Sequence, residues 1–222
     1  MKFTLAVAVA VVATTSSTQA AIDTVATQSE FGAAINGRGV IVEEIFPAAI
    51  PSARTITFST GVTSEATGSG FSTSFGDNSV LFPDTGPSDG FGEFFTGIGA
   101  SGVSPTTIVF TFPEPVFGFF APFESATGID VSVVGDATLF DVSELGSATS
   151  GSNQPFDGTF GVVTTGPTET FTQLVFSVDP AFGSSFETFG VDSFQFGVVP
   201  EPASAALLFS GLVALSVRRR RA

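Results

Sequence analysis

Hydrophobic and polar residues alternate along several short stretches of this chain after residue 39. Alternation with a period of two places every second side chain on the same face, which is typical of a β-strand with one buried and one solvated side. Ile108, Phe110 and Phe112 follow this pattern. The pattern predicts strands over residues 40–46, 55–59, 107–112, 129–134, 159–164, 171–178 and 189–198.

One helix is predicted before these strands. Thr27 and Glu30 are spaced as in a capping box, in which the threonine oxygen accepts a hydrogen bond from a backbone amide and the glutamate reaches back. Phe31 and Ile35 follow at helical spacing. An Asn-Gly pair at residues 36–37 then supplies the residue types that end a helix.

Stretches rich in Gly, Pro, Ser, Thr and Asp separate the predicted strands, at residues 64–70, 78–92, 97–105 and 147–158. No predicted strand is followed by a helix long enough for a parallel crossover. Short strands joined by such connectors predict an all-β fold, a single antiparallel β-sandwich that is jelly-roll-like and carries one short N-terminal helix.

Phe-Gly pairs recur along the chain, and they begin at Phe31, Phe75, Phe91, Phe117, Phe160, Phe182, Phe189 and Phe196. Their irregular spacing argues against a solenoid. We expect each pair to mark a strand end, where the ring enters the core and the glycine lets the chain turn. A disordered Phe-Gly mesh is the alternative, and the regular alternation within the strands argues against it.

The first 20 residues have the organisation of a secretory signal peptide. Lys2 precedes an apolar stretch at residues 3–13, and small and polar residues follow as far as Ala20. Charged, apolar and small-residue regions in this order predict export and cleavage after Ala20. An uncleaved anchor is the alternative, although eleven apolar residues are few for a membrane span.

The last residues form a second segment of unusual composition. Val199, Pro200, Glu201 and Pro202 precede an apolar run at residues 205–217, and the run is followed by Arg218, Arg219, Arg220 and Arg221. A helix over residues 203–217 would be about 22 Å long, which is less than the roughly 30 Å of a bilayer core unless the arginines reach out to the interface. The arginines place the C-terminus on the cytoplasmic side and leave the prolines on the far side.

This tail resembles the PEP-CTERM sorting signal of Gram-negative bacteria. The resemblance implies processing by an exosortase after secretion through the translocon, transient insertion in the inner membrane by a C-terminal transmembrane helix, and a final location at the cell surface or outside the cell. An ordinary C-terminal membrane anchor is the alternative. The chain then divides into a signal peptide at residues 1–20, a β-sandwich domain at 21–198 and a sorting signal at 199–222.

The domain between these segments is strongly acidic. The whole chain has a net charge of −14, but Lys2 and the four C-terminal arginines lie outside the domain, as does Glu201. Two cations, Arg38 and Arg54, and 20 acids remain, so the net charge of residues 21–198 is −18. Such a charge repels nucleic acid and anionic lipid and keeps a protein soluble in salt.

Several residue types needed for catalysis are missing from the domain. It has no His, Cys or Lys, so imidazole bases, thiol nucleophiles, disulfides and Schiff bases are excluded. Only carboxylates remain, and a glycosidase would need two of them about 5 to 10 Å apart. Glu43 and Glu44 are adjacent in a predicted strand and would point to opposite faces. We therefore expect no enzymatic activity.

Calcium is the one cofactor that the sequence leaves open. Carboxylate and amide oxygens are the ligands that Ca²⁺ takes, and a weak candidate site consists of Asp77, Asn78, Asp84, Asp89 and Asp192. No Asp-x-Asp-x-Asp-Gly spacing supports it, and the alternative is that these residues form turns by bonding their own backbone.

Two further stretches resemble segments common in PEP-CTERM proteins. Residues 108–119 resemble a strand, proline turn and strand, and residues 189–196 resemble a closing strand before the tail. The resemblance implies a lectin-like domain without a defined activity. We therefore expect an exported, noncatalytic extracellular matrix protein associated with exopolysaccharide. A calcium-dependent carbohydrate-binding module is the alternative, and a carboxylate glycosidase is a third hypothesis.

Overall fold

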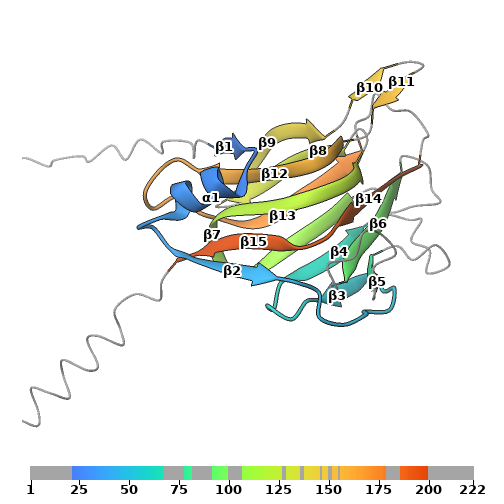
Figure 1. The fold of residues 1–222 in the computed structure, drawn as a ribbon, viewed down its shortest axis with the longest axis horizontal. Coiled ribbons are helices and arrows are strands. Elements are labelled where there is room, and N and C mark those ends of the chain that lie inside the picture. Colours follow the sequence, from blue (N-terminus) through green and yellow to red (C-terminus); the bar gives the residue numbers. More distant parts are fainter. Residues whose placement is uncertain are drawn as a thin grey trace, which may run out of the picture.

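The computed structural model describes residues 22–67, 78–81, 92–99, 107–126, 129–135, 138–145, 147–149, 152–154, 156–178 and 186–199. They form one short helix and antiparallel strands (Figure 1). The elements are β1 Ile22–Val25, α1 Gln28–Ile35, β2 Val40–Glu44, β3 Thr55–Thr57, β4 Thr63–Thr67, β5 Ser79–Leu81, β6 Glu93–Gly99, β7 Thr107–Ala126, β8 Ile129–Gly135, β9 Thr138–Leu145, β10 Ser147–Thr149, β11 Ser152–Gln154, β12 Phe156–Thr164, β13 Phe171–Val178, β14 Phe186–Val191 and β15 Phe194–Val198.

The antiparallel all-β fold with one short N-terminal helix is confirmed. Among the described residues, thirteen strands are joined by hydrogen bonds into one continuous sheet, and β10 and β11 form a separate hairpin. The division into the two sheets of a jelly roll stays a prediction, because β7 connects both parts of the hydrogen-bonded network.

Strand β7 organises the sheet, because its two halves have different neighbours. Residues 107–111 lie between β4 and β13, residues 118–120 lie between β15 and β12, and Phe123 lies between β14 and β12. The register breaks at the Pro-Glu-Pro sequence of residues 113–115. Proline has no amide hydrogen to donate, so this is where a strand bends most readily.

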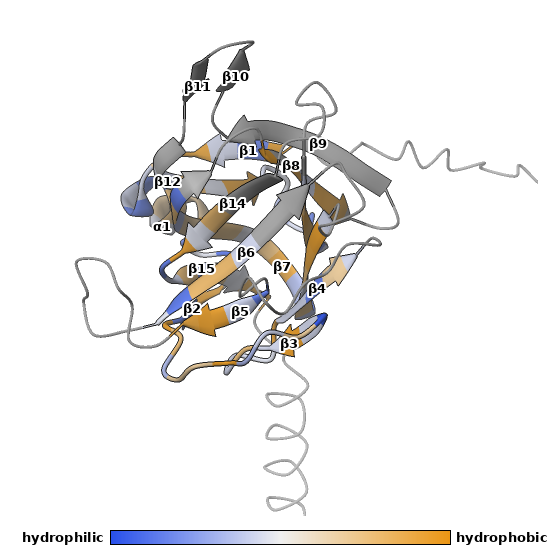
Figure 2. Cartoon of the chain, turned by 90° about the vertical axis from the view of Figure 1, so that its right-hand side faces the viewer, coloured by the Kyte–Doolittle hydropathy of each residue, from blue (hydrophilic) through white to orange (hydrophobic). Residues whose placement is uncertain are grey.

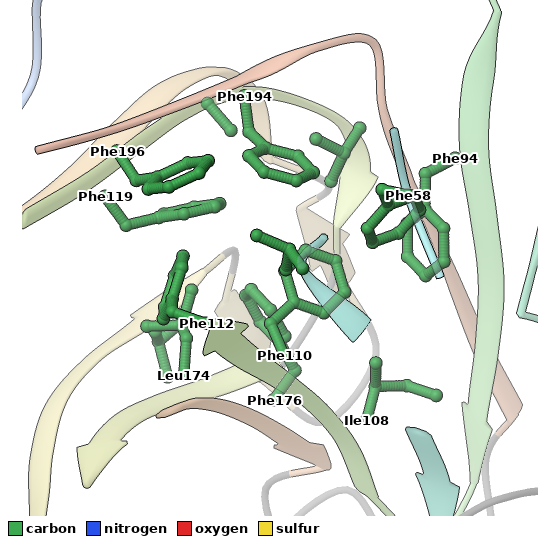
Figure 3. Packing of buried hydrophobic residues seen from close by; sticks show 14 of the residues in the cluster. Phe58, Phe94, Ile108, Phe110, Phe112, Phe119, Leu174, Phe176, Phe194 and Phe196 are labelled. Carbon is green, nitrogen blue, oxygen red and sulfur yellow. The ribbon is translucent and has the colours of Figure 1, made fainter. Parts of the chain in front are cut away.

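The bend brings the two halves of β7 face to face. In a straight strand, Phe110 and Phe119 would be about 30 Å apart. Their ring centroids are instead 6.2 Å apart, and the rings of Phe112 and Phe196 also meet, at 5.3 Å. Figure 3 shows these rings between strands above and below them. The core is thus a layer of phenylalanines enclosed by a sheet folded over on itself.

Hydrophobic stretches occupy the strands that surround this core (Figure 2). The fully buried rings come from segments far apart in the sequence, for example Phe46, Phe94, Phe176 and Phe189. Burying each ring stabilises the fold by about 2 to 3 kcal/mol. Many ring pairs meet edge to face, as Phe58 and Phe94 do, with centroids 5.6 Å apart.

Helix α1 begins and ends as the sequence predicts. Thr27 accepts a hydrogen bond from the amide of Glu30, and the Glu30 carboxylate accepts one from the amide of Thr27. Gly37 has a φ of 78°, the left-handed conformation that glycine adopts without strain. Phe31 and Ile35 are buried against the outer face of β7 and β15.

The prediction that the glycine of each Phe-Gly pair lets the chain turn at a strand end is wrong. Gly118, Gly161, Gly190 and Gly197 lie inside strands and not at strand ends. A Cβ atom at Gly197 would lie 2.6 Å from Ile35, and one at Gly161 would lie 2.7 Å from a backbone oxygen. These glycines leave room for neighbours, while the phenylalanine rings before them are buried as expected.

All four predicted connectors, 64–70, 78–92, 97–105 and 147–158, contain strand residues. They include much or all of β4, β5, β10 and β11, together with the end of β6 and the start of β12. The predicted strand 189–198 is two strands, because β14 pairs with β6 and β15 pairs with β2. These strands are short or polar, and pairing with distant neighbours determines them.

Candidate functional site

A groove of about 320 Å³ lies on the outer face of the sheet, beside the start of α1. Most of its lining is polar, and two rings and a proline complete it. The lining residues are Thr27, Gln28, Glu43, Phe120, Pro122, Thr159, Ser193, Phe194 and Gln195. Hydroxyl, amide and carboxylate groups from α1 and its N-cap, from β2, β12 and β15, and from the turn before β15 thus converge on one surface.

Strand register places the floor of the groove. Glu43 of β2, Gln195 of β15 and Phe120 of β7 are direct neighbours across the three strands. The amide nitrogen of Gln195 donates a hydrogen bond to Glu43, at 2.9 Å. The next strand contributes Gly161 opposite Phe120, and the space that a side chain would need there is taken by Val25 and by Phe120 itself.

Helix α1 forms one wall, and its first residues are fixed by several contacts. The ring of Phe31 stacks on Phe120, with centroids 5.7 Å apart, so only 5% of Phe120 is exposed. The hydroxyl of Thr159 donates to the carbonyl of Ala26, at 2.5 Å. The groove therefore offers a polar surface with little exposed ring area, and the described residues of its lining include one carboxylate, Glu43.

Glu44, the neighbour of Glu43, points into the protein as the alternation predicts. It is 1% exposed, and its two oxygens accept hydrogen bonds from the amides of Phe46 and Thr60 and from the hydroxyls of Ser59 and Thr60, at 2.8 to 3.1 Å. These donors replace the water that a buried carboxylate would lose. Glu44 joins the segment after β2 to the turn at Ser59 and Thr60, and it cannot reach a ligand in the groove.

Asn78 and Asp192 are the two calcium candidates that lie in the described part of the chain. Asn78 is fully buried, its oxygen accepts from Ser64 at 2.5 Å, and its nitrogen donates to the carbonyls of Ala53 and Arg54 at 2.7 and 2.9 Å. It therefore cross-links the chain around β3 and β4, and its oxygen faces a hydroxyl.

The other calcium candidates give no cluster within the described part of the chain. Asp192 lies between β14 and β15 and is half-buried. Asp77, Asp84 and Asp89 lie outside the described residues. Among the residues that the structure does describe, no three acidic side chains gather in a way that could hold a metal ion. The described residues do not test calcium binding, which the sequence left open as an alternative.

Arg38, one of the two arginines of the domain, holds the end of β12. Its guanidinium donates to the carbonyl and hydroxyl oxygens of Thr164, at 2.5 and 2.8 Å, and to the carbonyl of Gly166. It also lies 4.5 Å from the ring centroid of Phe117. Burial of the guanidinium lowers the pKa of Arg38, and the negative charge of Glu169 offsets part of this decrease.

The end of β15 connects the sheet to the C-terminal tail. Val198 is paired with Val40 on one side and with Val116 on the other, and Val199 packs against the cluster that contains Phe31 and Ile35. Residues 198–221 match the family model described as the PEP-CTERM protein-sorting motif.

The chain carries a PEP-CTERM motif. The motif implies that this protein is exported, passes through the membrane and is processed by an exosortase, a membrane protease. The match begins in the last residue of β15 and includes Pro200, Glu201, Pro202 and the arginines at 218–221. No curated protein and no solved structure matches the chain.

Two predictions about the ends of the chain lie beyond the structure. The signal peptide with its cleavage after Ala20, and the apolar run at residues 205–217, lie outside the described residues. Within the residues that are described, no helix is long and apolar enough to cross a membrane.

Sequence reasoning missed most of the groove. Gln28, Thr159, Ser193 and Gln195 were not singled out as site residues. A signal was present for Gln195, which is the polar residue between two buried phenylalanines and therefore points outward. No pattern in the sequence places it in the same groove as Gln28, because the position of Gln28 depends on where α1 packs.

Proposed function

We propose that the exported domain is a noncatalytic component of the extracellular matrix that binds exopolysaccharide in the groove beside α1. The observation that carries the proposal is the lining of this groove. Gln28, Gln195 and Ser193 offer donors and acceptors on one open surface. Sugars carry many hydroxyl groups. Amide and hydroxyl side chains can both donate hydrogen bonds to such groups and accept hydrogen bonds from them.

The charge of the site favours a neutral polysaccharide. Glu43 lies in the groove, and residues 21–198 carry a net charge of −18. An acidic polymer would be repelled by this field. A hydroxyl group, in contrast, can donate a hydrogen bond to the Glu43 carboxylate, which is a charge-assisted and therefore stronger bond.

The absence of a second carboxylate supports a binding role over a glycosidase. Hydrolysis of a glycosidic bond needs two carboxyl groups about 5 to 10 Å apart. Among the described residues that line the groove, only Glu43 carries a carboxylate, and the adjacent Glu44 is buried on the other face of β2. Calcium-dependent binding of carbohydrate remains the alternative proposal, and the described residues of the groove give it no ligand set.

Affinity electrophoresis of the secreted, processed protein through gels containing neutral or acidic polysaccharides tests the proposal. We expect neutral polysaccharides to retard the protein, and the double variant Gln28→Ala, Gln195→Ala to bind about tenfold more weakly, because it loses two hydrogen-bonding side chains. Gln173→Ala is the control, because Gln173 is also half-buried on a strand but bonds to Thr111 away from the groove. Equal retardation of all variants, or none for the wild type, would contradict the proposal.

A further inference from the structure

The surface where the tail leaves the domain has unusual properties. Val198 is the last residue of β15, and its neighbour Val40 begins β2. Val40 is 57% exposed and Ile41 is 40% exposed, and they are two of the three large hydrophobic side chains that are exposed among the described residues. Successive residues of a strand point to opposite faces, so Val40 and Ile41 lie on the two sides of β2 at its start. We call Asn36, Gly39, Val40 and Ile41 the exit surface, which includes both sides of this strand end.

The exit surface is hollowed and adjoins an unpaired strand edge. Ile41 lines a shallow depression of about 460 Å³ together with Ile35, Asn36 and Gly39. In the described part of the chain, β2 pairs with β15 alone, so its other edge has free backbone groups. Such an edge is a ready place for another protein to attach. Figure 1 shows the start of β2 and the helix α1 at the same end of the fold.

This surface also lacks the acidity of the rest of the domain. Residues 31–42 contain no Asp or Glu, although the domain has 20 acids. Their one charge is that of Arg38, which is bonded to Thr164 and Gly166. Low charge with exposed aliphatic side chains is the composition found at the centre of protein interfaces.

The sorting motif lies within a few residues of the exit surface. From Val198 to Pro202 is four residues, so the Pro-Glu-Pro sequence extends at most about 14 Å from the end of β15. One α-helix with its side chains is already about 10 to 12 Å wide. A protease that surrounds this sequence must therefore approach the surface from which the sequence leaves.

We propose that the exit surface is a docking site for the membrane protease that processes the sorting motif. The enzyme contacts Val40 and Ile41 while it holds the Pro-Glu-Pro sequence, so the folded domain contributes to recognition as well as the tail. This inference depends on the sorting motif alone and not on polysaccharide binding in the groove.

Processing of the full-length chain in cells that contain the exosortase tests the proposal. The rate at which precursor is converted to the shorter form would be followed by pulse labelling for the wild type and for the double variant Val40→Ser, Ile41→Ser. We expect conversion of the variant to be about five- to tenfold slower, because two partly buried aliphatic contacts are lost. Leu81→Ser is the control, because Leu81 is 41% exposed and lies on β5, away from the tail.

A linker provides a second, independent arm. Ten Gly and Ser residues between Val199 and Pro200 would separate the motif from the domain, and we expect the wild type with the linker to be processed as slowly as the double variant. An unchanged unfolding midpoint shows that the variants fold. The proposal is overturned if the double variant is processed at the wild-type rate, if Leu81→Ser slows processing equally, or if the linker accelerates it. Processing of the wild type that slows to the rate of the double variant at low expression would mean that the surface joins two copies of the chain, and would also overturn the proposal.

Discussion

Gly118 of β7 and Gly197 of β15 are paired directly opposite each other, and helix α1 lies over them. A Cβ atom at Gly118 would lie 3.0 Å from the ring of Phe31, and one at Gly197 would lie 2.6 Å from Ile35. The two glycines together form the hollow that receives both buried side chains of the helix. This contact positions Gln28 at the groove and Asn36 at the exit surface.

Gly118→Ala should destabilise the domain by about 1 to 3 kcal/mol, because the added methyl group would also lie 2.8 Å from the carbonyl oxygen of Val162, which cannot easily move. Urea unfolding measures the change. Gly32→Ala is the matched control. Gly32 is in the middle of α1 with no atom within 4 Å of an added Cβ, so this variant should be more stable by about 0.5 to 1 kcal/mol. Destabilisation by both variants to the same extent would contradict the packing described here.

Glu44→Gln should destabilise the domain by about 2 to 4 kcal/mol. The carboxylate accepts from four donor groups, and an amide nitrogen in place of one oxygen would face donors and leave them unpaired. Glu43→Gln, one residue away but exposed, should change the free energy of unfolding by less than about 0.5 kcal/mol. Similar losses for the two variants in urea unfolding would show that Glu44 is not held as described.

Asn78→Asp should lower the free energy of unfolding by about 3 kcal/mol or more. The Asn78 nitrogen donates to the carbonyls of Ala53 and Arg54, and a carboxylate oxygen in its place would face two carbonyl oxygens in a buried site. Ser64→Ala removes the single hydrogen bond to the Asn78 oxygen and should cost only about 1 kcal/mol. Thermal unfolding separates the two, and an Asp variant as stable as the wild type would refute the cross-link.

The contribution of Glu30 to the stability of the domain should depend on pH. Hydrogen bonds from the amide of Ala26 and the hydroxyl and amide of Thr27 lower the pKa of Glu30 below 4.5. A lowered pKa means that the stabilisation is present above the unfolded value and is lost as the pH falls through the folded value. The difference in stability between the wild type and Glu30→Ala should therefore be constant near neutral pH and shrink below pH 4.5. Unfolding at several pH values measures it, and a difference that grows in acid would contradict the assignment.

Calcium should stabilise the domain no more than magnesium does. Of the predicted ligands in the described residues, Asn78 already bonds to Ser64, and a charge of −18 attracts any divalent cation. Unfolding midpoints in calcium, in magnesium and after EDTA treatment provide the measurement. A saturable rise with calcium alone would instead place a specific site among the acids of residues 77–89 or at Asp192.

Local patterns predicted individual elements well. The capping box of Thr27 and Glu30 produced α1 with the expected first turn, and alternation predicted the bounds of β13, Phe171–Val178, without error. Both signals depend on neighbours within a few residues, so the sequence contains them directly. The polar strand β4, Thr63–Thr67, was missed, because it is a strand only through pairing with β3 and β7.

The sequence by itself determined where this protein goes and what its core is made of. The Pro-Glu-Pro sequence, the apolar run and the arginines specify the sorting motif, and the alternation of phenylalanines specifies a buried layer of rings. Only the tertiary structure decided that β7 folds back on itself, that Gly118 meets Gly197, and that Gln28 and Gln195 share one groove. Those contacts join residues far apart in the chain, and they form only when burial of the rings offsets the entropy of closing the long loops between them.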